Sequence, residues 1–388
     1  MSQTTIAYTN CADSEAAGAD LGAQIAASMK GEAPDAVIVF ASARYDHAQL
    51  LRAVQAACKP GCLMGATSAG EFTTTAQGNG KACALAIRAP DMRFSVGVGR
   101  NLGADRATAA TQLVSSFQGL TMHSFPFRTA LVLTDALAGH ADDLIDQLTF
   151  ATSGMYQFLG GGAGDDTRFQ KTHIFHGTEA ITDAVVALEI LSTKPVGIGA
   201  SHGWQPAGDG MRVTETDGMR LVSLNGMPAG QAFIQHAEST GQAFDRADPL
   251  PFFMHNILGI EVGGAHRLRV PLSVNEDGSI VCAAEIPIGA IVFIMKASVG
   301  SAIEAAEDAT RAALAGLQGS KPSVALLFDC LATRLRLGSA FRFELRAVDT
   351  LLDEASLVGC NTYGQIARAE GQFGGFHNCT AVVCILPD

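Results

Sequence analysis

One pattern of hydrophobic and polar positions occurs three times along this chain. Apolar runs of strand length lie at residues 35–40, 129–134 and 324–328. Each run is followed by apolar residues at the three- and four-residue spacing of an amphipathic helix, which reaches residues 58, 148 and 352 in the three copies. A glycine-rich polar stretch then closes each unit. Repetition at this scale predicts an internally repeated α/β fold, with mixed parallel and antiparallel sheets and helices.

The three glycine-rich stretches also resemble one another. Aligning Gly65 with Gly359 places Thr67 on Asn361, and the looser third copy is the stretch 160–165 (GGGAGD). We interpret these stretches as turns at strand ends, where glycine permits positive φ and lets a ligand approach the backbone. Chance recurrence in a chain rich in Gly and Ala is the alternative. The order of strand, helix and glycine stretch, found three times, favours a true repeat.

Further segments complete the expected layout. The matching sequences VGVG (96–99) and VGIG (196–199) support the duplication. After residue 204 the chain turns to short alternating runs and turn signals such as 275–278, which predict antiparallel strands. We therefore expect two halves, 1–215 with two repeated units and 216–388 with one unit and additional antiparallel strands. The remaining predictions are strands at 5–9, 82–88, 94–99, 184–191, 196–200 and 380–386, and helices at 14–29, 105–118, 229–236 and 301–316.

Composition narrows the function classes. The 388 residues are 48% hydrophobic and 16% charged, so a large core is easily supplied. The net charge of −12, without a Lys/Arg stripe, and an aromatic content of 6% disfavour nucleic-acid binding. No apolar run approaches the roughly 20 residues that span a bilayer. The N-terminus does not match a signal peptide. The nine cysteines, an odd number and mostly in apolar surroundings, indicate reduced thiols of a cytoplasmic protein.

The polar side chains of the glycine stretches are the candidate ligand-binding residues. In α/β proteins, ligands bind at the carboxyl ends of the strands, where these stretches are expected to lie. A small-ligand pocket between the two halves follows from this placement. For any single residue, capping of a turn is an equal alternative, but the set as a whole favours binding. The candidates are Thr67, Ser68, Gly70, Glu71, Gly162, Asp165, Asn361, Thr362, Tyr363, Gln365 and, near the last strand, Asn378.

Other chemistries have weaker signals. A phosphate loop is absent, and the Cys58/Cys62 spacing lacks the second pair that a zinc finger needs. Cys330 and Cys360 could act as nucleophiles, but no base and orienting acid accompany them at a recognisable spacing. His377, at the start of the last strand, is a candidate metal ligand if one ring nitrogen faces an apolar pocket. A local hydrogen bond at the strand start is the more common role for such a histidine.

Several motifs together resemble the FIST domain, in the order of its N-terminal and C-terminal parts. The motifs are GATSAGE (65–71), GGGAGD (160–165), GW (203–204), VT (213–214), NGMPA (225–229), GCNTYGQI (359–366) and HNCT (377–380). Gln365 stands where the family often has an acid, which places a charge-dependent role there in doubt.

The resemblance implies a sensory input domain of bacterial signalling that binds small ligands such as amino acids. Without a kinase, cyclase or methyl-acceptor segment, the chain resembles stand-alone members, some of them similar to nitric-oxide-sensing haem proteins that regulate a partner histidine kinase. The resemblance to those haem proteins implies that His377 is the possible axial haem ligand. A haem-free metabolite sensor, a cysteine enzyme and a scaffold remain alternatives, and a homo-oligomer stays open.

Overall fold

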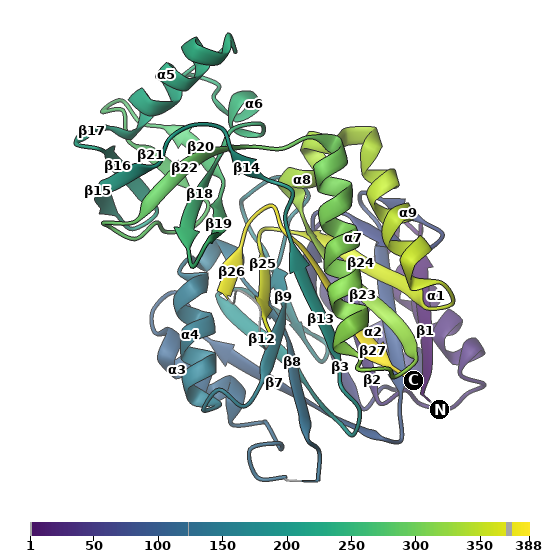
Figure 1. Cartoon of the computed structure of the whole chain (residues 1–388). Coiled ribbons are helices and arrows are strands. Elements are labelled where there is room, and N and C mark those ends of the chain that lie inside the picture. The colour runs from purple at the N-terminus through teal and green to yellow at the C-terminus, as the bar shows by residue number, and fades with distance from the viewer. Residues whose placement is uncertain (1, 123, 370–374) are drawn as a thin grey trace.

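The computed structural model describes residues 2–122, 124–369 and 375–388. Within them it confirms the predicted α/β class with mixed sheets. A body of three similar units carries a smaller inserted domain, which projects from one end of the body (Figure 1). The two chain ends lie together, and the backbone N–H of Ser2 donates to a carboxylate oxygen of Asp388 at 3.0 Å.

The three units of the body share one order of elements: a first strand, a helix, a strand, one to three further helical segments, a parallel strand, a hairpin and a closing strand. The first unit contains β1 (Gln3–Thr9), α1 (Ser14–Ser28), β2 (Ala36–Ser42), α2 (His47–Cys58), β3 (Cys62–Ser68), β4 (Glu71–Thr73), β5 (Gln77–Gly78) and β6 (Ala82–Arg88). The second contains β7 (Met92–Arg100), α3 (Arg106–Val114), β8 (Phe127–Thr134), η1 (Ala136–Ala138), α4 (Ala141–Ala151), β9 (Gln157–Gly162), β10 (Ile174–His176), β11 (Glu179–Ile181) and β12 (Ala184–Ser192). The third contains β13 (Gly197–Ser201), α7 (Val299–Gly316), β23 (Pro322–Cys330), α8 (Leu331–Leu337), η2 (Gly338–Ala340), α9 (Phe341–Leu352), β24 (Ser356–Thr362), β25 (Gln365–Arg368), β26 (Gly375–His377) and β27 (Ala381–Pro387).

The three units exchange hairpins in a cycle. The sheets have the orders β1-β6-β2-β3-β10-β11, β7-β12-β8-β9-β25-β26 and β13-β27-β23-β24-β4-β5. Each sheet therefore contains four strands of its own unit and a hairpin from another unit. The hairpin β4–β5, which precedes residue 215, completes the sheet of the third unit, so strands from both sides of that residue share a sheet. The division of the chain at residue 215 stays a prediction.

The core of the body lies between the three sheets. Apolar residues of all three units meet there, and the rings of Phe40 and Phe328 pack edge to face at 5.7 Å. The outer face of each sheet is covered by its own helices: α1 and α2, α3 and α4, and α7 with α9 (Figure 1). Each sheet thus buries both faces, which explains why its central strands read as continuous apolar runs rather than alternating ones.

The glycine stretches differ from their expected form as turns. Gly65, Gly160 and Gly359 lie inside strands β3, β9 and β24, each paired in parallel with the preceding strand of its unit. A Cβ atom at these positions would come within 1.9, 1.9 and 2.0 Å of a carbonyl oxygen of that neighbouring strand. Close approach of two strands, rather than a turn, requires glycine here. The polar residues that follow each glycine do lie at the strand end, as predicted.

The inserted domain interrupts the third unit between β13 and α7. Its strands form one nine-stranded sheet around a separate apolar cluster that includes Phe233 and Phe253. The first and last strands of the insertion, β14 and β22, pair with each other where the chain leaves and re-enters the body. In the part of the chain described, no helix is long and apolar enough to cross a membrane. The elements are β14 (Gln205–Pro206), β15 (Met211–Asp217), β16 (Arg220–Leu224), β17 (Met227–Pro228), α5 (Ala229–Thr240), α6 (Leu250–Phe253), β18 (Ile257–Val262), β19 (Ala265–Arg269), β20 (Pro271–Val274), β21 (Ile280–Cys282) and β22 (Ile291–Lys296).

Candidate functional site

The ends of β3, β9 and β24 meet at one junction. The backbone N–H of Gly164 donates to the carbonyl of Thr67, that of Ala69 to Asn361, and that of Tyr363 to Gly162, each at 2.9 Å. Each strand end therefore contacts the other two. The repeated topology produces this convergence because the three units are related in a cycle and their parallel strands end at the same side.

An acid lies buried within this junction. Glu71 is fully buried and accepts hydrogen bonds from the hydroxyl of Ser68 (2.5 Å) and the backbone N–H of Lys81 (3.0 Å). Burial raises the pKa of Glu71 to about 8, although both hydrogen bonds oppose the shift. Arg334 Nη1 donates to Asn361 Oδ1 at 2.8 Å. Arg334 Nη1 also lies against Gly70, because a Cβ atom built on Gly70 would be 1.3 Å from this nitrogen.

Asp165 organises the loop that follows β9. Its carboxylate accepts hydrogen bonds from the backbone N–H groups of residues 169, 170 and 171 at 2.7 to 2.9 Å, and from the hydroxyl of Tyr363. Burial alone would raise the pKa of Asp165, but these donors stabilise the carboxylate and lower it. The Tyr363 ring stacks on Phe169 with 4.4 Å between ring centroids. Asp165 thus has a structural role that its place in the glycine stretch did not reveal.

The other predicted residues also bond to the protein itself. Thr67 Oγ1 accepts from the backbone N–H of His173 at 2.9 Å, and Gln365 Nε2 donates to Thr362 Oγ1 at 2.9 Å. Asn378 Oδ1 accepts from the backbone N–H of Val270 at 3.4 Å. Among the described residues, the buried Nδ2 of Asn361 has no hydrogen-bond partner. The structure brings the set together, and direct ligand binding by these residues stays a prediction.

A recess opens beside the junction, and the sequence did not predict it. It lies between the end of β13, the first turns of α7, and helices α8 and α9. The empty space in and in front of it, open solvent included, is about 230 Å³, and the centre of a water-sized group can occupy about 10 Å³ of it, close to the smallest space that holds a water molecule. Its lining residues are Ser201, His202, Gly203, Trp204, Ala302, Ala305, Asp329, Thr333, Arg336, Glu344, Cys379 and Ala381. Thr362 Oγ1 donates to the Asp329 carbonyl at 3.3 Å, which joins the recess to the junction.

Two acids in this recess lack hydrogen-bond partners. Asp329 and Glu344 are each 1% exposed. Both carboxylate oxygens of Asp329, Oε2 of Glu344 and Nε of Arg336 have no partner among the described residues. Burial raises the pKa of Asp329 well above its usual range, and the neighbouring Glu344 adds to that shift. Burial raises the pKa of Glu344 to about 8. Buried acids without donors are rare in folded proteins, and acids with raised pKa values in a recess mark a candidate functional site.

A sequence signal for these residues existed. Glu344 falls on the apolar face formed by Phe341, Leu345 and Val348, where a charged residue breaks the amphipathic pattern. Asp329 is a single acid at the end of an otherwise apolar strand. Each exception by itself has many explanations, and only the packing of α9 against β23 places the two acids together.

Comparison with known families identifies the chain. The FIST N domain matches residues 35–227 and the FIST C domain matches residues 237–368. The chain belongs to the FIST family. FIST domains are small-ligand sensing domains of signalling proteins. Among curated proteins, no match was found. The two matched regions meet near α5, within the inserted domain.

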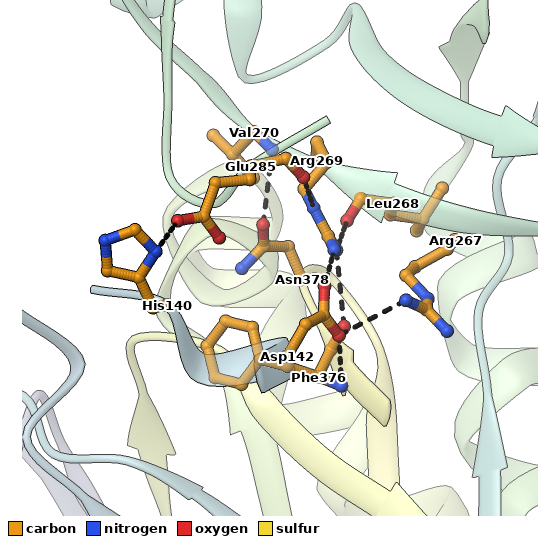
Figure 2. A network of polar contacts seen from close by, with 9 residues as sticks. All are labelled: His140, Asp142, Arg267, Leu268, Arg269, Val270, Glu285, Phe376 and Asn378. Atoms are coloured by element: carbon orange, nitrogen blue, oxygen red, sulfur yellow. Dashed lines mark hydrogen bonds and ion pairs between the residues drawn. The ribbon is translucent and has the colours of Figure 1, made fainter. Parts of the chain in front are cut away.

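A buried ion-pair network joins the FIST N and FIST C parts (Figure 2). Asp142, in the first turn of α4, accepts hydrogen bonds from Arg269, from Arg267 at 3.2 Å and from the backbone N–H of Phe376 at 2.9 Å. Arg269 is 1% exposed and also donates to the carbonyl oxygens of Glu285 at 2.9 Å and Phe376 at 3.2 Å. The network fixes the inserted domain to the second unit and to the β25–β26 hairpin.

Proposed function

We propose that this FIST protein is a small-ligand sensor whose ligand binds in the recess between β13, α7, α8 and α9. The observation that carries the proposal is the pair of buried acids in the lining of the recess: both oxygens of Asp329 and Oε2 of Glu344 have no hydrogen-bond donor among the described residues. A ligand that supplies those donors gains interactions that the free protein lacks. The junction residues Thr67 to Glu71 and Asn361 to Gln365 then act as the layer that supports the recess.

The position of the recess suits signal transmission. It lies at the root of the inserted domain, next to both linkers. Arg336 donates to the carbonyl oxygens of Ala297 (3.4 Å) and Ser298 (3.3 Å) in the second linker, and its guanidinium lies 5.0 Å from the ring centroid of Trp204 in the first. A ligand that draws Arg336 toward itself changes contacts with both linkers. A sensor requires that its ligand bind two conformations with unequal affinity, and here the two conformations would differ in the position of the inserted domain.

Haem is the more specific form of the sensor hypothesis, and the surroundings of His377 do not fit it. His377 is 4% exposed and lies in β26, opposite Gln365 of β25. Burial, aided by the positive charges of Arg267 and Arg269, lowers the pKa of His377 to about 3, so the ring is neutral and could ligate a metal. However, the recess described above does not reach this residue. We therefore favour an amino acid or another small metabolite over haem as the ligand.

A haemin titration tests this preference. The haem-free sensor predicts a broad absorption spectrum that does not saturate, in the wild type and in His377→Ala alike. A sharp Soret band that saturates at one haem per chain and is lost in His377→Ala would instead support the nitric oxide sensor.

A screen with two readouts tests the sensor itself. Trp204 is the only tryptophan in the sequence and lines the recess, so intrinsic fluorescence reports on the site directly. Amino acids and other small metabolites are added to the full chain, and fluorescence and melting temperature are recorded. A ligand selective for the folded protein must raise the melting temperature. If no small molecule changes either signal, a scaffold role is favoured over sensing.

A double variant separates the recess from the junction. Thr67→Val with Asn361→Leu removes polar groups of the junction, whereas Glu344→Gln alters the recess alone. Ligand affinity is expected to fall in Glu344→Gln and to change little in the double variant. The opposite result would place the ligand at the junction.

The output of the sensor is proposed to reach a partner protein such as a histidine kinase. The inserted domain projects from the body (Figure 1), and its outer surface is the part proposed to contact such a partner. The autophosphorylation rate of a candidate kinase, with and without this protein and its ligand, is the corresponding measurement. A rate that does not depend on this protein would argue against a kinase as its partner.

A further inference from the structure

The charges around the recess do not balance. Two buried carboxyl groups, Asp329 and Glu344, face one guanidinium, that of Arg336. With both acids ionised, one negative charge has no counterpart. A buried ion without a partner is costly, which is why both acids hold their protons more strongly than usual in the free protein. A ligand with one positive charge would restore neutrality.

The other titratable groups at the recess do not supply that charge. His202 is neutral because burial lowers its pKa, and both ring nitrogens are engaged, with the His266 carbonyl (2.8 Å) and the Trp204 backbone N–H (3.3 Å). The Cys379 thiol has a pKa raised well above the usual range, chiefly by the Cys330 thiol. Cys330, next to Asp329 in sequence, has a pKa lowered to about 6, chiefly by Cys379, and adds one negative charge. The guanidinium of Arg334, which interacts with Asp329 from the neighbouring helix, adds one positive charge, so the excess of one negative charge remains.

The unpartnered oxygen atoms define what the ligand must donate. Three carboxylate oxygens lack donors among the described residues: Oδ1 and Oδ2 of Asp329 and Oε2 of Glu344. A primary ammonium group has three N–H donors and accepts nothing. The recess leaves about 10 Å³ to the centre of a water-sized group, which is room for one such group, and an ammonium head matches that size.

Apolar residues in the lining of the recess suit a short apolar chain. Its walls include the methyl groups of Ala302, Ala305 and Ala381 and the ring of Trp204. The described residues contain no group of three or more His, Cys, Asp or Glu side chains placed to hold a metal ion, so the recess favours an organic cation.

We propose that the recess binds a small monocationic primary amine, with its ammonium group between Asp329 and Glu344 and its alkyl chain against α7 and Trp204. The proposal rests on the proposed function, because it names the ligand class of the same recess. It predicts discrimination against the amino acid of the same skeleton. The carboxylate of a zwitterion would return a negative charge to a site where Arg336 already compensates only one of two acids.

The pH dependence of binding is a further consequence. Below the pKa of Glu344, about 8, the incoming cation must displace a proton from the recess. Affinity for a primary amine should therefore rise with pH between about 6 and 8, by up to roughly tenfold per pH unit for each proton that leaves. It should fall again only as the amine itself loses its proton, near a pKa of about 10.4 for a lysine-like ammonium.

The test compares three probes on the full chain. n-Propylammonium carries charge and N–H donors, 2-aminobutyrate adds a carboxylate to the same skeleton, and tetramethylammonium carries charge without N–H donors. Binding is followed by Trp204 fluorescence and by calorimetry in two buffers of different ionisation heat, which counts released protons. We expect n-propylammonium to bind at least about tenfold more tightly than either other probe, with protons released at pH 7.

Variants assign the effect to the recess. Glu344→Gln should weaken n-propylammonium at least about tenfold and reduce its pH dependence, because one charged acceptor is lost. Asp329→Asn gives a second measurement should either variant fold poorly. Asp349→Asn, on the same helix α9 but outside the recess, is the matched control and should bind as the wild type does.

Two failures can be told apart. If n-propylammonium does not bind, or binds no better than 2-aminobutyrate or tetramethylammonium, while another metabolite changes Trp204 fluorescence, the amine proposal is overturned and the sensor proposal stands. If no compound of any class changes fluorescence or melting temperature, both are overturned. Equal n-propylammonium affinity in the wild type, Glu344→Gln and Asp329→Asn would also overturn the amine proposal.

Discussion

Replacing Asp142 by Ala should weaken the attachment of the inserted domain. The side chain of Arg269 is 1% exposed and that of Asp142 is 24% exposed, so the pair is largely removed from water. Removing one partner of a buried ion pair costs about 3–5 kcal/mol, and the partial exposure of Asp142 places the expected loss near the lower end, about 3 kcal/mol. The substitution also removes the acceptor of the Phe376 N–H.

The neighbouring Asp143 is the matched control. It lies in the same helical turn and pairs with Arg106 at 2.7 Å, but the two side chains are 46% and 21% exposed. Exposed ion pairs contribute about 0–1 kcal/mol, so Asp143→Ala should change stability little. Both variants lose one acid from the first turn of α4, so the effect of the helix dipole cancels between them.

Thermal unfolding and limited proteolysis measure the difference. With about 2 °C per kcal/mol for a large domain, Asp142→Ala should lower the melting temperature by about 6 °C. Protease cleavage within residues 205–296 should become faster, because the inserted domain loses a point of attachment. Asp142→Asn keeps an acceptor for Phe376 and should lie between the wild type and Asp142→Ala. Equal melting temperatures for Asp142→Ala and Asp143→Ala would refute the reasoning.

Two further predictions concern the junction. Gly70→Ala should cost about 3 kcal/mol in urea unfolding, because φ is +143° and because the new Cβ displaces Arg334 from its hydrogen bond with Asn361. Gly177→Ala, at φ +57° with nothing within 4 Å, should cost only about 1 kcal/mol, and a similar loss in both would contradict the steric argument. Glu71 has a pKa of about 8 in the folded protein against 4.5 for an ordinary glutamate, so the folded state binds its proton more strongly and the free energy of unfolding falls as pH rises between those values. In Glu71→Gln this fall should be shallower by up to about 1.4 kcal/mol per pH unit, and parallel curves for the two proteins would rule out the assigned pKa.

Much of the body could be predicted from the amino-acid pattern alone. The apolar runs at 35–40, 129–134 and 324–328 are β2, β8 and β23, and the helix predicted at 301–316 is nearly all of α7. These elements could be predicted because each depends only on its own residues. The spacing of the apolar residues matches the geometry of a strand or of a helix. The repeated VGVG and VGIG sequences were also informative. Gly97, Gly99, Gly197 and Gly199 lie in the first strands of the second and third units, where the carbonyl oxygens of α3 and α7 leave no room for a Cβ.

Only the tertiary structure decided how the units combine. The exchange of hairpins depends on edges of sheets far apart in sequence, and hydrogen bonding between backbones leaves no signature in the residues that pair. The sequence also could not show whether the glycine stretches were turns or strands. A strand packed closely against its neighbour needs glycine for a steric reason, as a turn does. The recess belongs to this class as well. Asp329 and Glu344 are separate exceptions to an apolar pattern, and they form one charged site only because α9 packs over the end of β23 at the root of the inserted domain.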